Sequence, residues 1–288
     1  MALVIDPALP AYSALTGSDI HTTGSKSARI KIAFVNLMPK KEETEIDFLR
    51  LMAPSDVIAE IKLVKMTTHR SKNTSAEHIN RFYTSFDEAL ATGIDGVIIT
   101  GAPLENVPFE SVDYWNEITG IFDIIRLRRI PSLFICWAAF AALYHHHRLP
   151  WHIIDRKISG VYPHRILCTD SLTEGLTDGF LMPHSRYAVW DEEEIKRIPD
   201  IRVIAEGDRQ GPYLSRSVSF PEYYITGHGE YHALTLDGEY RRDLAKGINP
   251  TIPENYYPDN DPNRTPTNRW HEEALLIMDN WLHCIADR

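Results

Sequence analysis

Short apolar segments alternate with helical patterns along the first half of the chain, and this alternation restricts the fold more than any other feature. Four apolar segments of strand length end at polar residues, glycine or proline: residues 30–37, 58–66, 96–100 and 132–135. Between them, hydrophobic residues recur with helical spacing at 43–52, 75–91 and 114–129. Strands that alternate with helices form parallel sheets covered on both faces. We therefore predict an α/β fold with a doubly wound, mostly parallel sheet.

The second half of the chain has a less regular pattern. We expect strands near 160–167, 201–205, 213–216 and 223–226, and helices at 232–246 and 272–286. The stretch 249–268, rich in proline, asparagine and aspartate, is predicted to be an ordered loop that wraps the domain. We interpret residues 1–288 as one domain, with an N-terminal extension at 1–29 and a C-terminal wrapping loop plus helix at 249–288.

Charge and cysteine content restrict the partners and the compartment. The formal net charge is −10 and is spread along the chain, which opposes nucleic-acid binding and favours small-molecule substrates. No apolar run is long enough to cross a membrane, and no export signal is evident. Cys136, Cys168 and Cys284 lack the spacing of a metal site or a disulfide framework. We expect reduced thiols in a cytoplasmic protein.

Cys136 lies where a predicted strand meets a predicted helix. Residues 132–136 form a short apolar strand, and the alanine-rich stretch 137–145 has the composition of a helix. A nucleophile elbow has this strand-turn-helix arrangement. A thiol at a helix N-terminus is favoured as a thiolate, and nearby backbone N–H groups can hold an oxyanion. The alternative is a buried structural cysteine, because free cysteines are among the most buried residues.

A base for this thiol could come from the segment 223–231, which predicts a strand followed by Gly-His-Gly-Glu. In extended or turn conformation, residues two apart point the same way, so His228 and Glu230 can both face the active site. The residues predict a Cys136–His228–Glu230 triad. A surface turn is the alternative, since a His-x-Glu pair often occurs by chance.

Several ordered motifs together resemble a known family. They are Asn-Leu-Met-Pro-Lys-Lys at 36–41 with Glu-Thr-Glu at 43–45, Thr-Gly-Ala-Pro at 100–103, Cys-Trp-Ala at 136–138, Lys157 with Ser-Gly-Val-Tyr at 159–162, Pro-His-Ser-Arg-Tyr at 183–187, and Thr-Gly-His at 226–228 with Glu-Tyr at 230–231. The chain resembles the homoserine O-succinyltransferase and O-acetyltransferase enzymes. Their fold is the class I glutamine amidotransferase-like (flavodoxin-like) three-layer sandwich.

The resemblance implies a ping-pong acyltransferase of amino-acid biosynthesis. Cys136 would accept the acyl group as a thioester, and His228, oriented by Glu230, would act as the base. The acyl-CoA is then a co-substrate, and no cofactor or metal is expected. Carried over residue by residue, the family pattern implies roles for four further side chains: Lys157 and Arg242 for the amino acid, Ser185 for acceptor choice, and Lys41 for the acyl donor or acyl-enzyme. The resemblance also suggests a homodimer.

Glu105 occupies the position at which the family selects its donor. Members with glycine there favour succinyl-CoA, whereas members with glutamate favour acetyl-CoA. A carboxylate fills the pocket and repels the free succinyl carboxylate. The resemblance therefore implies a homoserine O-acetyltransferase of methionine biosynthesis.

The pattern also departs from the family in ways that leave the acceptor open. Trp270 is followed by His-Glu-Glu, where members usually have Arg-Ser-His, and Gly229 stands where many have proline. Serine O-acetyl transfer, in cysteine biosynthesis, remains an alternative, because serine and homoserine differ by one methylene, which contributes only ~1–3 kcal/mol to discrimination. Homoserine O-succinyl transfer is a second alternative.

Two further classes of function compete with acyl transfer. Glutaminases of this fold usually have Gly-x-Cys-x-Gly, whereas Phe134 and Ala138 flank Cys136 here. A catalytically silent binding or regulatory protein would keep the fold but need no complete triad. The histidine run at 145–147 suggests a metal site at first sight. We predict that this run is a helix end, where the histidines complement the negative end of the helix dipole. A metal site is not expected, because consecutive helical residues point in different directions and cannot bind one ion together.

Overall fold

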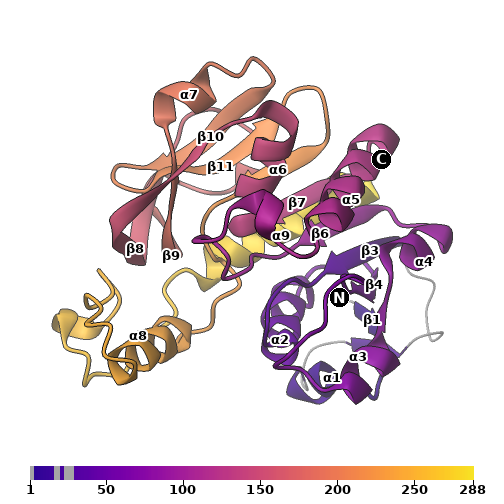
Figure 1. Cartoon of the computed structure of the whole chain (residues 1–288), viewed down its shortest axis with the longest axis horizontal. Helices are drawn as coiled ribbons and strands as arrows, with labels where there is room; N and C mark the ends of the chain where they lie inside the picture. The colour runs from indigo at the N-terminus through magenta and orange to yellow at the C-terminus, as the bar shows by residue number, and fades with distance from the viewer. Residues whose placement is uncertain (1–2, 16–19, 23–28) are drawn as a thin grey trace.

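One sheet runs through the molecule, and its first half is parallel (Figure 1). The computed structural model describes residues 3–15, 20–22 and 29–288. The parallel strands stand in the order β2 (Ile20–Thr22), β1 (Leu3–Ile5), β4 (Ala59–Val64), β3 (Ile30–Val35), β6 (Gly96–Ile99), β7 (Ser132–Ile135) and β12 (Glu222–Ile225). A short strand, β5 (Tyr83–Thr84), pairs with the end of β4. Strands β3, β6, β7 and β12 are almost wholly buried, as expected for strands covered on both faces.

The second half of the sheet is antiparallel and was not predicted as such. Beyond β12 the strands follow in the order β11 (Gly211–Ser217), β10 (Ile201–Gly207), β8 (Trp151–Ile166) and β9 (Phe180–Trp190). In Figure 1 they lie together with α7 (Glu192–Lys196) on one side of the molecule, away from β1 and β4. The doubly wound, mostly parallel sheet is confirmed, and an antiparallel extension is added to it.

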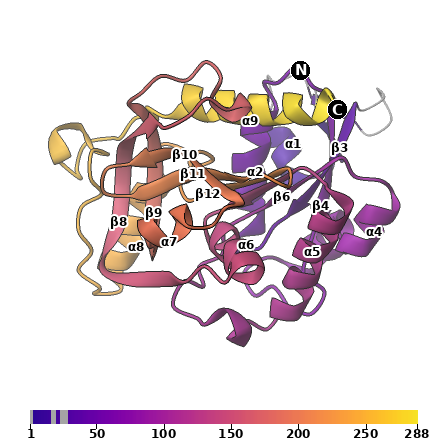
Figure 2. The same cartoon turned by 90° about the horizontal axis from the view of Figure 1, so that it is seen from above.

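Helices cover both faces of the parallel part and make three layers, as predicted. The first face carries α1 (Pro10–Ala14), α2 (Lys41–Met52) and α9 (His271–Ala286), and the second carries α4 (Phe86–Ala91), α5 (Trp115–Arg128) and α6 (Trp137–His147). Figure 2 shows α9 along one face of the sheet and α5 and α6 along the other. Alternation along β3 produces this division, because Phe34 packs with the first set and Val35 with the second. None of the helices in the described ranges is long and apolar enough to cross a membrane.

Two predictions of secondary structure were wrong. The single helix expected at 75–91 is divided into α3 (Ala76–Phe82), β5 and α4. Ser85 starts the second helix through a capping box, in which its hydroxyl accepts from the Glu88 N–H and its own N–H donates to the Glu88 carboxylate. The strand β9 was not predicted, and β8 begins nine residues earlier than expected, at Trp151.

The segment 249–270 is tied to the sheet and to α8 (Thr235–Ala245). The Glu254 N–H donates to the Ser159 carbonyl (2.9 Å), and the Val161 N–H donates to the Glu254 carbonyl (2.9 Å). This contact requires glycine at position 160, because a Cβ there would lie 2.3 Å from the Glu254 carbonyl oxygen. The Tyr257 hydroxyl donates to Asp237 on α8 at 2.6 Å. These hydrogen bonds hold the segment against β8 and α8.

The register of the parallel strands places the functional loops together. Ile225 of β12 stands opposite Ile135 of β7, and Phe134 stands opposite Ile99 of β6. The loops that follow these strands therefore leave the sheet side by side at its carboxyl edge. In open α/β sheets this edge is where ligands bind.

Candidate active site

Cys136 is the turn residue between β7 and α6. Its backbone has φ 47° and ψ −113°, a conformation that non-glycine residues rarely adopt. The neighbouring chain fixes this geometry: the Cys136 N–H donates to the Ile225 carbonyl (2.7 Å), and its carbonyl accepts from the N–H groups of Ala139 and Phe140. The thiol is thereby presented at the start of α6, as in a nucleophile elbow.

His228 and Glu230 lie next to this thiol. A Cβ built on Gly101 would stand 3.3 Å from the Cys136 Cβ and 3.8 Å from the His228 Cε1, so both side chains meet above this glycine. The imidazole Nδ1 is 2.7 Å from the Glu230 carboxylate. The structure brings together the three residues that the sequence predicted as a triad.

The imidazole is positioned from two further sides. The backbone N–H of His228 donates to the Pro183 carbonyl at 2.8 Å. The Tyr231 ring stacks on the imidazole, with centroids 4.4 Å apart and an interplanar angle of 15°. With 5% of its surface exposed, His228 has little freedom to turn away from the thiol.

The charges around His228 favour its protonated form. Burial alone lowers the pKa of an imidazole, but the Glu230 carboxylate and the Cys136 sulfur outweigh burial and raise the pKa of His228 well above its ordinary value. A protonated imidazole beside a thiol stabilises the thiolate, which is the nucleophilic form of cysteine. The arrangement can therefore support covalent catalysis with proton transfer through His228.

Glu239 links two of the other predicted site residues, although the sequence analysis did not select it. Its carboxylate accepts from the Lys157 ammonium (2.9 Å), the Ser185 hydroxyl and the Tyr231 hydroxyl (2.9 Å). Burial raises the pKa of Glu239, but Lys157 and these hydrogen bonds lower it overall, so the carboxylate is ionised at neutral pH. The only signal in the sequence is its place one helical turn before Arg242 on α8.

Arg242 and Lys41 do not join this hydrogen-bonded group. The Arg242 side chain is 52% exposed, and its Nε donates to Asp243 at 2.8 Å. Lys41 is buried, and its ammonium donates to the carbonyl oxygens of Asn36 and Met38 in the loop after β3. Burial lowers the pKa of Lys41 to about 8. In this structure the Lys41 side chain supports the loop after β3.

Glu105 reaches the same edge of the sheet from the loop after β6. Its carboxylate accepts the backbone N–H of Tyr187 on β9 at 2.8 Å. This hydrogen bond fixes a negative charge between the β6 loop and the strand that carries Ser185. The role of Glu105 in donor selection stays a prediction.

The histidine run forms the C-terminal end of α6, as predicted. The expected complement to the helix dipole was wrong for His146, because burial lowers its pKa to about 3 and keeps the ring neutral. The expectation that consecutive histidines point apart was also wrong. Ring nitrogens of His145 and His146 and a carboxylate oxygen of Asp123 lie within 4.8 Å of one another, and His145 is 2.8 Å from Asp123.

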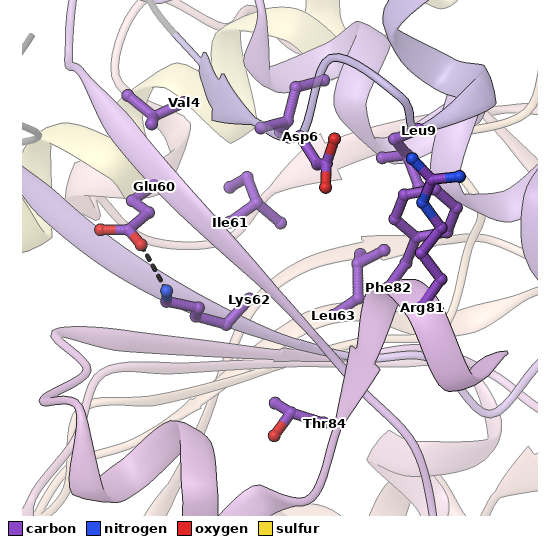
Figure 3. A pocket seen from close by; sticks show the side chains of 11 residues that line it. Val4, Asp6, Leu9, Glu60, Ile61, Lys62, Leu63, Arg81, Phe82 and Thr84 are labelled. Carbon is purple, nitrogen blue, oxygen red and sulfur yellow. Dashed lines mark ion pairs between the residues drawn. The ribbon is translucent and has the colours of Figure 1, made fainter. Parts of the chain in front are cut away.

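A cavity of about 210 Å³ lies at the edge of β4, far along the sheet from Cys136. Figure 3 shows Leu9, Ile61 and Phe82 among its lining side chains, together with the Glu60–Lys62 ion pair. A second cavity, of about 350 Å³, has three aromatic side chains in its lining, Phe109, Tyr144 and Trp151, and lies beside the loop that carries Glu105.

Asp47 on α2 adds a titratable acid beside Glu230. Burial, and then the Glu230 charge, raise the pKa of Asp47 from 3.8 to about 7. The folded state therefore binds more protons than the unfolded state between these values, so this group costs stability as pH rises through about 4 to about 7. We predict that Asp47→Asn raises the free energy of unfolding by up to about 4 kcal/mol at about pH 8, with little gain near pH 4. Urea unfolding at both pH values measures this, and an equal gain at both would contradict it.

Comparison with known proteins places the chain in a family. The family described as Homoserine O-succinyltransferase matches residues 2–288. A protein of Bacteroides fragilis named homoserine O-acetyltransferase is 41% identical, covering 98% of this chain and 95% of that protein. Proteins of the same name from Methanomassiliicoccus intestinalis (42%, covering 98% and 94%) and Thermotoga neapolitana (40%, covering 100% and 97%) are equally similar.

Solved structures confirm the fold at much lower identity. A glutamine amidotransferase from Thermotoga maritima superposes with a TM-score of 0.63 at 10% identity, covering 91% of this chain and all of that one. A glutamine amidotransferase from Methylobacillus flagellatus gives a TM-score of 0.55 at 11% identity, covering 91% and 94%. These likenesses establish a class I glutamine amidotransferase-like architecture. Because the family match and the relatives both extend along nearly the whole chain, this protein belongs to the homoserine O-succinyltransferase family, a family of acyltransferases.

Proposed function

We propose that this protein is a homoserine O-acetyltransferase, which moves the acetyl group of acetyl-CoA through Cys136 to the hydroxyl of homoserine. The observation that carries the proposal is the meeting of Cys136, His228 and Glu230 above Gly101. The names of the full-length relatives supply the acetyl donor and the homoserine acceptor. We further propose that it acts in the cytoplasm, in methionine biosynthesis.

The first half-reaction acetylates the cysteine. The Cys136 thiolate attacks the thioester carbonyl of acetyl-CoA, and the new carbon–sulfur bond leaves negative charge on the carbonyl oxygen. In the first turn of α6 the Ala139 and Phe140 N–H groups bind the Cys136 carbonyl. The N–H groups of Trp137 and Ala138 are therefore the ones that can stabilise this charge. The intermediate then expels the coenzyme A sulfur, which takes its proton from His228.

The second half-reaction reverses the role of the imidazole. Neutral His228 takes the proton of the homoserine hydroxyl while the oxygen attacks the acetyl-thioester. Collapse of the intermediate releases O-acetylhomoserine and restores the Cys136 thiolate beside protonated His228. Glu230 holds the ring with its Nε2 toward the reacting atoms in both steps.

The ion pair between Lys157 and Glu239 suits a zwitterionic amino acid. The Lys157 ammonium can bind the α-carboxylate of homoserine, and the Glu239 carboxylate can bind its α-ammonium. Ser185 donates to the same carboxylate and lies on β9 next to the strand that carries Lys157. Arg242 would add to carboxylate binding after exchanging its hydrogen bond with Asp243 for one with the substrate.

Glu105 is predicted to select the donor by its charge. In Glu105→Gly, the carboxylate that accepts the Tyr187 N–H is removed, and this N–H becomes available to a succinyl carboxylate. We expect the ratio of kcat/KM for succinyl-CoA to that for acetyl-CoA to rise at least tenfold. Glu105→Gln separates charge from volume. A substantial rise of this ratio in Glu105→Gln indicates that the Glu105 charge repels the succinyl carboxylate. A rise in Glu105→Gly alone indicates that the volume of the Glu105 side chain excludes the succinyl group. No change in either variant would contradict the role of Glu105.

The proposed function is tested by incubating the protein with acetyl-CoA or succinyl-CoA, alone and with homoserine or serine. Intact mass and released coenzyme A are recorded for each combination. We expect an acetyl adduct from acetyl-CoA and its discharge by homoserine. Discharge of the acetyl adduct by serine but not by homoserine would show that serine is the acceptor. The absence of both an adduct and coenzyme A release would refute acyl transfer through a cysteine.

A further inference from the structure

Arg186 on β9 is a buried cation that forms no ionic hydrogen bond within the described part of the chain. Only 1% of its surface is exposed. Its terminal nitrogens donate to the backbone carbonyls of Ala188 and Gln210, and its Nε has no partner among the residues that the structure describes. Burying a charge without a counter-charge is costly, so the anionic groups nearby decide what this guanidinium does.

The guanidinium faces the start of α6. Its Cζ lies 6.0 Å from the centroid of the Phe140 ring, and the Phe140 N–H donates to the Cys136 carbonyl. On the neighbouring residue of β9, the Tyr187 N–H donates to the Glu105 carboxylate. Arg186 therefore lies against the helix that begins at the proposed nucleophile, and the next residue of its strand binds the donor-selecting carboxylate.

The histidines around Arg186 add no positive charge beside it. Burial and then the charge of Arg186 lower the pKa of His184 well below its ordinary value, and burial lowers the pKa of His164 to about 4. Both rings are neutral at pH 7. Burial also lowers the pKa of Arg186 to about 10, while Cys136 and Glu105 are the largest influences that oppose it. The guanidinium still carries its full charge at neutral pH.

We propose that Arg186 is a fixed positive charge that favours the thiolate of Cys136, and that Glu105 partly offsets this charge. The inference rests on the proposed cysteine nucleophile. Arg186 acts across space, without a hydrogen bond to the sulfur, and is therefore a positioning residue. It also keeps its proton throughout the reaction, whereas His228 must release its proton in the first half-reaction and recover it in the second.

Other groups that face Cys136 have different roles. His228, from the loop after β12, supplies the second positive charge and is itself paired with Glu230. Tyr231, from the same loop, stays neutral because burial and then the Glu239 charge raise its pKa well above the ordinary value. Arg186 from β9 and Glu105 from the loop after β6 complete the charged surroundings. Changing either of these two should alter the thiol without removing its base.

The experiment is alkylation of the full-length protein by iodoacetamide across about pH 5 to about pH 9. Peptide mass mapping separates Cys136 from Cys168 and Cys284, and circular dichroism checks folding. For Arg186→Met we expect the alkylation rate of Cys136 at pH 7 to fall about tenfold, with its pH midpoint moved upward. Arg186→Lys should recover part of the loss, and Glu105→Gln should alkylate faster than the wild type.

A folded Arg186→Met variant with the wild-type pH profile would overturn the proposal. Where that variant does not fold, the other two decide: an unchanged rate in both Arg186→Lys and Glu105→Gln overturns it as well. Failure of the proposed function is distinguishable, because then Cys136 of the wild type would itself resist alkylation at neutral pH. No acyl donor is needed in this experiment, so donor choice does not affect its outcome.

Discussion

The Cys136→Ser variant is expected to transfer acyl groups at least about 1,000-fold more slowly than the wild-type chain. Serine keeps the shape of the residue at the strained turn between β7 and α6. Its hydroxyl remains protonated, however, so the positive charge that the site directs at position 136 has no anion to stabilise. Intact mass after incubation with acetyl-CoA should show no adduct, and coenzyme A release should stop.

Cys168→Ser is the matched control for this variant. Cys168 is another half-buried thiol, and its sulfur is 3.7 Å from the Val203 carbonyl, away from the His228 group. We expect this variant to form the acetyl adduct at the wild-type rate. An adduct that persists in Cys136→Ser but disappears in Cys168→Ser would show that the nucleophile is Cys168 and not Cys136.

The parallel core could be predicted from the sequence because its strands are buried on both faces. Such strands are largely apolar, and β3, β6 and β7 were each found within two residues of their ends. The alternating strand β4 was found with the same accuracy. The same runs located Cys136, since a nucleophile elbow follows directly from a strand that meets a helix. His228 and Glu230 were found by the same reasoning after β12.

The strand β9 could not be predicted in the same way. It contains Pro183 and two buried polar side chains, His184 and Arg186, which do not fit the hydrophobic pattern of a buried strand. These polar residues are buried because β9 carries part of the site. The structure was needed to show that β9 brings Ser185 and Arg186 to the functional edge of the sheet.

Glu239 could not be selected because its role depends on tertiary contacts alone. In the sequence it is one of many helical glutamates, and a solvated charge is the ordinary expectation. Its three partners, Lys157, Ser185 and Tyr231, come from β8, β9 and the loop after β12. Only the folded chain brings these distant segments around one carboxylate. A residue with such partners has a function that can be tested separately from that of Cys136.

Glu239→Gln is expected to separate the two half-reactions. The α-ammonium of homoserine would lose its anionic partner, and Lys157 would lose its counter-charge, while the residues around Cys136 remain in place. We expect the acetyl adduct to form normally from acetyl-CoA, and its discharge by homoserine to slow about 100-fold. Stopped incubations followed by intact mass measure both rates on one sample.

The Glu60→Gln variant offers a control of similar exposure. Glu60 also pairs with a lysine, at 2.5 Å, and its side chain is 18% exposed, compared with 19% for Glu239, but it lies beside the cavity on β4. Both half-reactions should be normal in this variant. If Glu239→Gln instead slowed acetylation and discharge equally, Glu239 would act through Tyr231 on His228, because that stacked pair serves both steps. Discharge at the wild-type rate in Glu239→Gln would show that the Glu239 carboxylate does not take part in binding the amino acid.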